Sequence, residues 1–251
     1  MNFELNKTQI ELTNALNTLL EKFDDDYWLD CDLNSKFPQE FYEEVASGGW
    51  LGMCMPEKFG GSNLGIREAS LFMQTISESG GGMAAASSIH INIFGPHPIV
   101  IHGTEKQKET WLPPLITGKE KTCFGVTEPD SCLDTGRLKT KAQKVQGGYI
   151  INGQKIWTST AQVANKILLL ARTTDQSQTK KTVDGLTLFL SRLNWSIWLP
   201  LIVFISIAGI VLFVVDVKQQ KQEELRLGDW ADKLPETKYV PKGNMMNLEL
   251  P

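Results

Sequence analysis

The chain has few residues of the kinds that build metal centres and disulfide frameworks. Its 251 residues include three histidines and four cysteines, and the cysteines are far apart, with no CxxC spacing. Both a disulfide framework and a zinc site need cysteines or histidines in closely spaced groups. The sequence therefore predicts reduced thiols and no metal site.

An excess of positive charge is also absent. The chain carries 25 lysines and arginines against 29 aspartates and glutamates, a net charge of −4, and its isoelectric point is about 5.5. Proteins that bind DNA or RNA usually concentrate lysine and arginine on one surface. We expect no nucleic-acid partner.

The N-terminal residues lack the features of a cleavable targeting signal. They show no basic segment followed by an apolar one, and no arginine-rich amphipathic presequence. We therefore expect the body of the protein to stay on the side of the membrane where it is made, cytoplasmic or matrix.

One long apolar run is present, at residues 195–215, and it contains no charged side chain. A bilayer core of about 30 Å needs roughly 20 helical residues, whereas a strand needs far fewer. Trp195 and Trp198 would lie at the headgroup level. The run predicts a single transmembrane helix over 194–216 and a single-pass membrane location. The alternative, a core helix or two buried strands, would need a polar turn that the run lacks.

The remaining sequence divides at about residue 120. Apolar residues recur at helical spacing before this point, for example Leu12 and Leu16, and an acidic run at 24–26 is expected to end the first helix. After it, short apolar segments alternate with glycine-rich turns such as Gly147-Gly148. The fold class is therefore α+β, with an all-α domain over 1–120 and a partial antiparallel β domain over 121–191.

The expected strands are short. They lie at 123–127, 137–145, 149–151, 155–159, 167–172 and 186–190. The last segment, 217–251, is expected to form a charged helix followed by an irregular tail.

Two motifs carry the most specific signal. They are FGVTEPDSCLD at 124–134 and NGQKIWTS at 152–159, and they are accompanied by GWLGMCMPEKFGG at 49–61 and GTEKQKETWLPPLITGK at 103–119. Over roughly residues 1–190 the chain resembles the acyl-CoA dehydrogenase family of flavoproteins. The resemblance implies a non-covalent FAD on the β domain. It also implies dehydrogenation of an acyl-CoA, in which a carboxylate removes the α-proton while the flavin takes a hydride from the β-carbon.

The resemblance also assigns roles to residues. Phe124, Val126 and Thr127 would line the flavin ring, Trp157 would pack against it, and Ser159 would lie near its N5 atom. The full set expected to contact FAD is Phe124, Gly125, Val126, Thr127, Leu133, Trp157, Thr158 and Ser159. The implied partners are an acyl-CoA substrate, an electron-transferring flavoprotein, and further copies of the chain or a partner chain.

The sequence departs from the family pattern in two places. Cys132 and Leu133 stand where the family commonly has glycine and then serine, and the serine approaches the pyrophosphate. From Ser191 onward, the helical bundle that carries the family's catalytic glutamate is not recognisable, so no catalytic residue is assigned. Three hypotheses stay open: a membrane-tethered dehydrogenase, a non-catalytic membrane-anchored scaffold or subunit derived from the family, and a fused or mispredicted gene product.

Overall fold

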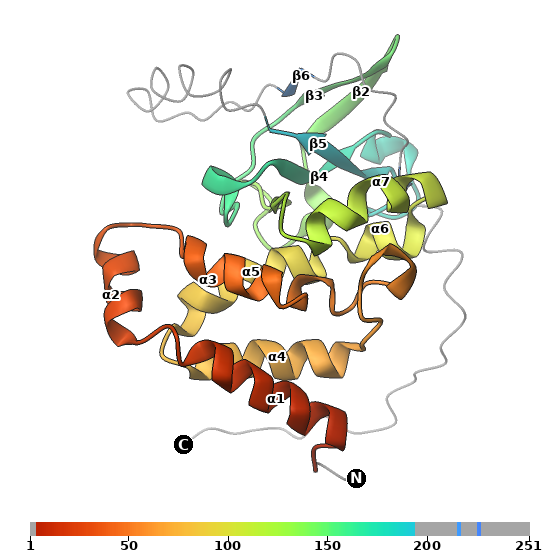
Figure 1. Cartoon of the computed structure of the whole chain (residues 1–251). Coiled ribbons are helices and arrows are strands. Elements are labelled where there is room, and N and C mark those ends of the chain that lie inside the picture. Colours follow the sequence, from red (N-terminus) through yellow and green to blue (C-terminus); the bar gives the residue numbers. More distant parts are fainter. Residues whose placement is uncertain (1–3, 194–214, 217–224, 227–251) are drawn as a thin grey trace, which may run out of the picture.

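The computed structural model describes residues 4–193, 215–216 and 225–226. A layer of helices lies beneath a layer of strands (Figure 1). The helices are α1 (Lys7–Leu20), α2 (Asp25–Leu33), α3 (Gln39–Ser47), α4 (Ile66–Glu78), α5 (Gly82–Phe94), α6 (His97–His102) and α7 (Glu105–Ile116). The predicted N-terminal helical domain is thus present in the described residues.

The first helices pack around one apolar core. Helix α1 buries Leu12, Leu16 and Leu20 because these residues recur every four positions and fall on one face. The acidic run at 24–26 was expected to end this helix. Instead, α1 ends at Leu20 and the acidic run begins a second helix. Asp24 caps α2 by accepting a hydrogen bond from the N–H of Tyr27 at 3.0 Å.

The sheet is mixed, and the predicted antiparallel module was wrong on this point. Its described strands are β1 (Thr122–Gly125), β2 (Lys141–Val145), β3 (Gly148–Asn152), β4 (Lys166–Arg172), β5 (Leu186–Arg192), β6 (Val215–Asp216) and β7 (Leu225–Arg226). The order is β6-β3-β2-β4-β5-β7, and β1 pairs with β4. The pairs β1–β4 and β2–β4 are parallel, whereas β2–β3 and β4–β5 are antiparallel.

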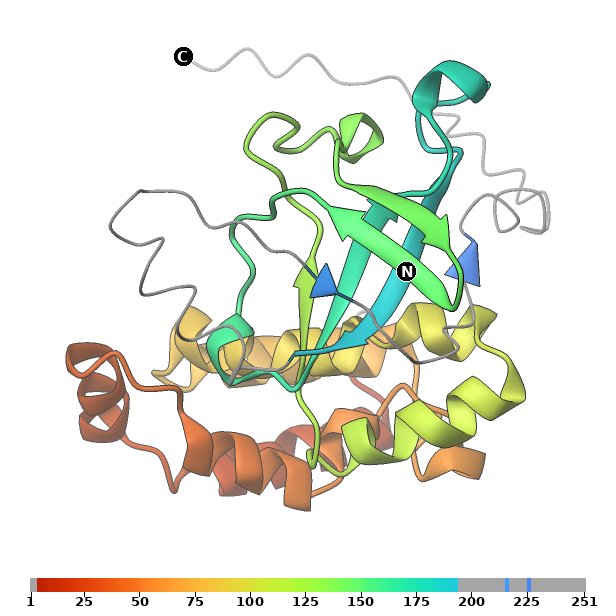
Figure 2. The ribbon, with the colours of Figure 1, turned by 90° about the horizontal axis from the view of Figure 1, so that it is seen from above.

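The central strand β4 is buried on both faces. Leu168 and Leu170 pack with Ile99 of α6 and Leu112 of α7, between the sheet and the helices. The alternate residues of β4 belong to a separate cluster on the other face. Alternation of side chains along a strand produces this division. Figure 2 shows the strands crossing over the helices when the molecule is seen from above.

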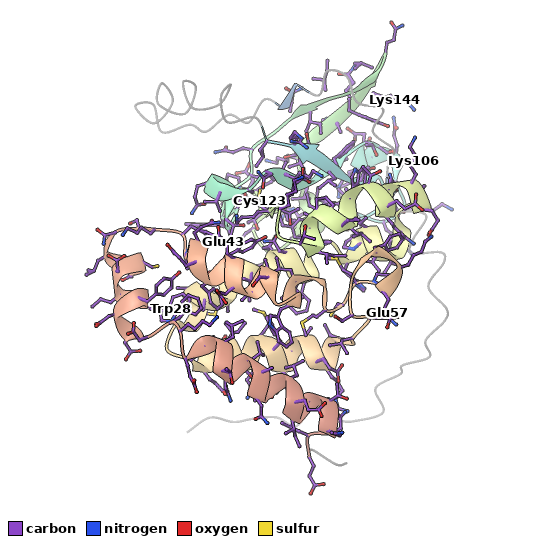
Figure 3. The ribbon with its side chains drawn as sticks, in the orientation of Figure 1. Trp28, Glu43, Glu57, Lys106, Cys123 and Lys144 are labelled. Carbon is purple, nitrogen blue, oxygen red and sulfur yellow. The ribbon has the colours of Figure 1, made fainter. Side chains whose placement is uncertain are left out.

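A buried amide joins the two layers. Asn92 of α5 has no exposed surface, and its Oδ1 accepts a hydrogen bond from the N–H of Thr122, the first residue of β1, at 2.9 Å. Nearby, the Lys121 ammonium lies 4.3 Å from the ring centre of Tyr42, which belongs to α3. Figure 3 labels Trp28 in the helical layer and Lys144 in β2, on the β2–β3 hairpin.

The predicted membrane span lies almost entirely outside the described residues. The last two residues of the predicted helix, Val215 and Asp216, form strand β6, which pairs with β3, so the prediction of a helix is wrong at these two residues. Leu225 and Arg226, in the segment expected to be a charged helix, form β7 beside β5. Of the helices in the described part of the chain, none is both long and apolar enough to cross a bilayer.

Candidate functional site

The residues predicted to line the flavin ring follow one another along β1 and just beyond it. Phe124 and Val126 are half-buried and pack against the cluster that faces α6 and α7. Gly125 is buried, and a Cβ atom there would lie 2.9 Å from Cδ1 of Ile167 on β4. Its lack of a side chain therefore lets β1 lie close to its parallel neighbour.

The two sequence motifs meet in space. The N–H of Ile156 donates to the carbonyl oxygen of Thr127 at 2.9 Å. Farther along the same segment, the hydroxyl of Thr160 lies 3.3 Å from the carbonyl oxygen of Thr122 and 2.6 Å from that of its neighbour Ser159, and it can donate to either. The segment from 155 to 160 thus contacts Thr127, two residues after β1, near its start and Thr122 of β1 at its end.

This segment is not a strand, contrary to the prediction for 155–159. Trp157 and Thr160 have φ angles of +56° and +61°, in the left-handed region that side chains other than glycine rarely adopt. Such residues interrupt a ladder of strand pairing. The Trp157 side chain is 84% exposed, which is unusual for so large an apolar group.

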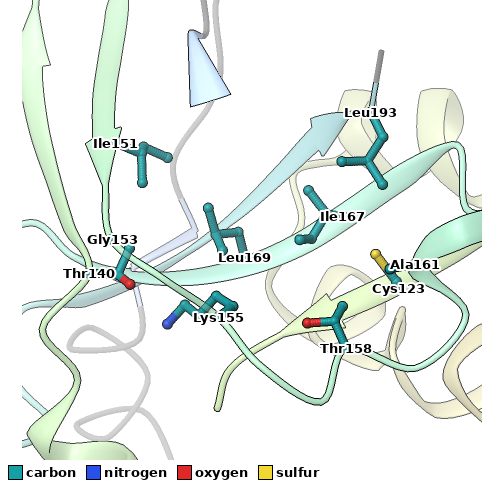
Figure 4. Close-up of a pocket in the computed structure, with 10 residues that line it drawn as sticks. All are labelled: Cys123, Thr140, Ile151, Gly153, Lys155, Thr158, Ala161, Ile167, Leu169 and Leu193. Atoms are coloured by element: carbon teal, nitrogen blue, oxygen red, sulfur yellow. The ribbon is translucent and has the colours of Figure 1, made fainter. Parts of the chain in front are cut away.

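The other two predicted residues of this segment differ in their surroundings. Thr158 is half-buried and Ser159 is exposed. Thr158 lines a small apolar pocket together with Cys123, Ile167 and Leu169, which lie on the sheet face away from α6 and α7 (Figure 4). The predicted flavin residues therefore do not all share one surface, because Phe124 and Val126 face the helices.

The pocket in Figure 4 is too small for a cofactor. Its cavity volume is about 30 Å³, enough for a few water molecules at most. Its lining is almost wholly apolar and comes from strands of the sheet and the segment after β3. We interpret it as a gap in the packing of the β layer and assign no flavin to it. Within the described part of the chain, no three His, Cys, Asp or Glu side chains converge as metal ligands.

A buried ion pair lies between the two motifs. The Lys155 ammonium is 2.8 Å from the carboxylate of Glu128, and their side chains are only 4% and 6% exposed. The same ammonium donates to the carbonyl oxygen of Val126 at 3.0 Å. The carboxylate also accepts from the main-chain N–H groups of Lys139 and Thr140, at 2.6 and 2.9 Å.

These contacts shift both ionisation equilibria. Burial alone would raise the pKa of Glu128, but the hydrogen bonds from Lys155 and from the N–H groups outweigh it, so the pKa of this carboxyl lies below its ordinary value. Burial lowers the pKa of Lys155 against the opposing effect of Glu128. Lys155 and the two main-chain N–H groups thus stabilise Glu128 as a carboxylate.

The loop at 129–138 holds the residue expected near the pyrophosphate. Leu133 is 94% exposed. Cys132 beside it is exposed and has a φ of +42°, so the position where the family commonly has glycine keeps a left-handed backbone here without glycine. A leucine side chain offers an anion no hydrogen-bond donor.

A single arginine holds the far end of this loop. Arg172 of β4 is 4% exposed and donates to the carbonyl oxygens of Gly136 and Leu138, at 2.9 and 3.3 Å. It also donates to the carbonyl oxygens of Thr182 and Asp184, at 2.9 and 3.1 Å. All these described partners are main-chain groups, so the guanidinium joins two loops to the sheet.

Sequence reasoning did not assign roles to Glu128, Lys155 or Arg172. A signal for the first two was present, because Glu128 directly follows the expected strand 123–127 and Lys155 begins the expected strand 155–159. Buried charges are usually paired, and their opposite signs could have suggested the pair. No local signal marks Arg172, since its partners are carbonyl groups.

Comparison with known proteins is consistent with this geometry. The family model "Acyl-CoA dehydrogenase, N-terminal domain" matches residues 6–119, and the model "Acyl-CoA dehydrogenase, middle domain" matches residues 123–194. The chain belongs to the acyl-CoA dehydrogenase family. The boundary between the two matches coincides with the start of β1, where the helical layer gives way to the sheet.

Individual members of the acyl-CoA dehydrogenase family match the same part of the chain. Probable acyl-CoA dehydrogenase YngJ of Bacillus subtilis is 30% identical over 188 residues, which are 74% of this chain and 49% of YngJ. Butyryl-CoA dehydrogenase of Megasphaera elsdenii is similar in structure, with a TM-score of 0.68 and 28% identity, over 76% of this chain and 50% of that one. The acyl-CoA dehydrogenase of Geobacillus kaustophilus gives a TM-score of 0.69 and 26% identity, over 77% and 50%. The chain thus spans about half the length of these relatives.

Proposed function

We propose that residues 6–194 form the flavin-facing half of an FAD-dependent acyl-CoA dehydrogenase. The observation that carries this proposal is the position of Trp157. Its indole is 84% exposed, and its backbone follows Ile156, which is bonded to Thr127. An exposed aromatic surface held next to the end of β1 suits the face of an isoalloxazine ring, because large flat side chains cover such rings and exclude water.

The described residues fit the ring portion of FAD better than its pyrophosphate. Thr127 is half-buried and carries a hydroxyl beside the segment 155–160. The next residue, Glu128, is held in place by its hydrogen bond with Lys155. When bound, FAD would supply hydride acceptance from the β-carbon of an acyl-CoA thioester. The protein would orient the ring and shield it. No residue of the described part is assigned as the base that removes the α-proton. We propose that this base comes from another part of the chain or from a partner chain.

A non-catalytic subunit is the second candidate, and one observation favours it. Cys132 and Leu133 occupy the turn expected to approach the pyrophosphate, and the leucine has no donor. A protein that kept the fold but bound FAD weakly or not at all would serve as a scaffold. Flavin binding separates the two candidates.

The experiment is a titration of the purified full chain with FAD, followed by the visible flavin spectrum and by quenching of flavin fluorescence. We expect saturable binding at one site, and a loss of affinity of about tenfold in Trp157→Ala. The control is Leu33→Ala, an exposed apolar position (73% exposed) at the end of α2, which should leave binding unchanged. Absence of saturable binding by the wild type would reject the dehydrogenase in favour of the scaffold.

Outside Val215, which lies in β6, the predicted membrane span over 195–215 stays a prediction, and so does a single-pass location. So do electron transfer to an electron-transferring flavoprotein and assembly with further copies or a partner chain. Extraction of the expressed full chain tests the first of these. Recovery from membranes only with detergent is the expected result, and recovery in the salt-washed soluble fraction would contradict it.

A further inference from the structure

The ion pair between Glu128 and Lys155 lies at the point where the two motifs meet. The Lys155 ammonium donates to the carbonyl oxygen of Val126 and to the carboxylate of Glu128. The N–H of the next residue, Ile156, donates to the carbonyl oxygen of Thr127. Three consecutive residues after β1 are thus held by two consecutive residues before Trp157. No slip of one segment along the other can preserve all three bonds.

Glu128 extends this arrangement to a third segment. Its two carboxylate oxygens accept the N–H groups of Lys139 and Thr140, which directly precede β2. The side chain therefore connects the end of β1, the entry to β2 and the segment that carries Trp157. On the far side of Trp157, the buried Thr160 adds a weaker contact, because its hydroxyl lies 3.3 Å from the carbonyl oxygen of Thr122 and also 2.6 Å from that of Ser159.

Stability alone does not explain a buried pair at this place. Removing two charges from water costs several kcal/mol per ion in proteins, and well-packed apolar side chains of similar size are often equally stable or more so. Trp157 adds a further cost, because its φ of +56° lies in a strained region. A strained and exposed residue persists only where its neighbours fix the backbone on both sides.

We propose that Glu128 and Lys155 are positioning residues that fix the backbone of the Trp157 segment and so set the orientation of the indole toward a bound flavin. The orientation of the indole toward a flavin rests on the proposed function. The attachment of the backbone of the Trp157 segment does not, since it can be measured without any ligand.

The test uses the full chain with both charges removed, as Glu128→Gln/Lys155→Met. The double variant leaves no unpaired charge in the interior, so we expect it to fold. Amide hydrogen exchange of Ile156 reports the bond to Thr127 in the absence of flavin. We expect exchange at Ile156 to be at least about tenfold faster than in the wild type, while amides of the helical core keep their protection. FAD should bind about tenfold more weakly.

Two further variants sharpen the result. Lys155→Arg keeps the charge, and it should recover part of the protection at Ile156. Lys166→Met removes the cation of a second enclosed pair in the same sheet, with Glu120. It should leave Ile156 exchange and FAD affinity unchanged, because Lys166 has no bond to the Trp157 segment among the described contacts.

The outcomes are distinct. If Ile156 exchanges at the wild-type rate in the double variant, the positioning role is wrong, whether or not the protein binds FAD. The same holds if Ile156 exchanges faster but FAD affinity is unchanged. If the wild type binds no FAD, the proposed function fails. Faster exchange at Ile156 would then support only the attachment of the segment, and the flavin part of the inference would be rejected.

Discussion

The main-chain N–H of Ile156 donates a hydrogen bond to the carbonyl oxygen of Thr127 at 2.9 Å. Each of these residues lies in one of the two motifs that resemble the acyl-CoA dehydrogenase family. The bond shows that the motifs form a single structural unit, and that Trp157 follows directly from it. Changes to either motif should therefore affect the other.

The turn at Cys132 should respond to restoration of the family's usual residues. Glycine at 132 removes the cost of a left-handed backbone, about 1 kcal/mol, and serine at 133 adds a donor near the expected pyrophosphate. We expect Cys132→Gly/Leu133→Ser to bind FAD at least about tenfold more tightly than the wild type. Fluorescence titration measures the dissociation constant.

The control for this variant is Leu133→Ala, which shortens the exposed side chain without adding a donor. Its affinity should equal that of the wild type. Equal affinity in the double variant and the control would show that the 132–133 turn does not contact the cofactor.

The ionisation of Glu128 predicts a dependence of stability on pH. Its pKa in the folded protein lies below the ordinary value of a glutamate, because Lys155 and two N–H groups outweigh burial. The contribution of Glu128 is therefore fully present above the pKa of the unfolded chain, about 4.3, and is lost as the pH falls through the folded value. Urea unfolding of wild type and Glu128→Gln, from neutral pH to about pH 3, measures it.

The variant provides the reference for this experiment. Other carboxyls with lowered pKa, such as Asp30 and Glu105, contribute equally to both proteins. The difference in unfolding free energy between wild type and variant should therefore shrink on acidification. A constant difference over this range would contradict the assignment.

Arg172 should be among the most sensitive positions for stability. Arg172→Met leaves the carbonyls of Gly136, Leu138, Thr182 and Asp184 without their buried donor. Each unsatisfied buried group costs about 1–3 kcal/mol, so we expect a loss of at least about 3 kcal/mol in urea unfolding. Arg192→Met is the matched control, because Arg192 lies in the same sheet with its side chain 69% exposed and should cost less than about 1 kcal/mol.

The approach of the segment after β3 to the entry of β2 should tolerate no side chain. A Cβ atom at Gly153 would lie 2.6 Å from the Cα of Thr140. Gly153→Ala should therefore cost about 1–3 kcal/mol, and melting followed by circular dichroism measures it. Gly147→Asn, in the hairpin turn with φ of +88° and open space around it, should melt close to the wild type. Equal melting temperatures for the two variants would show that the segments can separate without cost.

The sequence predicted the features that depend on neighbouring residues. The helical spacing of Leu12 and Leu16 and the Gly147-Gly148 turn produced the first helix and the β2–β3 hairpin, because each is determined over a few positions. The parallel pairing of β1 with β4 depends on contacts between distant segments, and local alternation does not encode it. For this reason the sheet was expected to be antiparallel.

The site was predictable to a similar degree. The resemblance identified Thr127 and Trp157, and the structure brings their segments together. It did not identify the left-handed backbone of Trp157, because that conformation is imposed by attachments on both sides and not by tryptophan itself. The role of Arg172 was not predicted either, because its partners are main-chain carbonyls, which leave no pattern in the sequence.

Asn92 has one more consequence. Its amide is the described hydrogen-bond partner of the first N–H of β1 and belongs to a helix at the centre of the lower layer. Loosening that helix would leave the strand with an unmet polar group and would disturb the sheet from its first residue. Helices and strands of this protein should accordingly melt together, in one cooperative calorimetric transition.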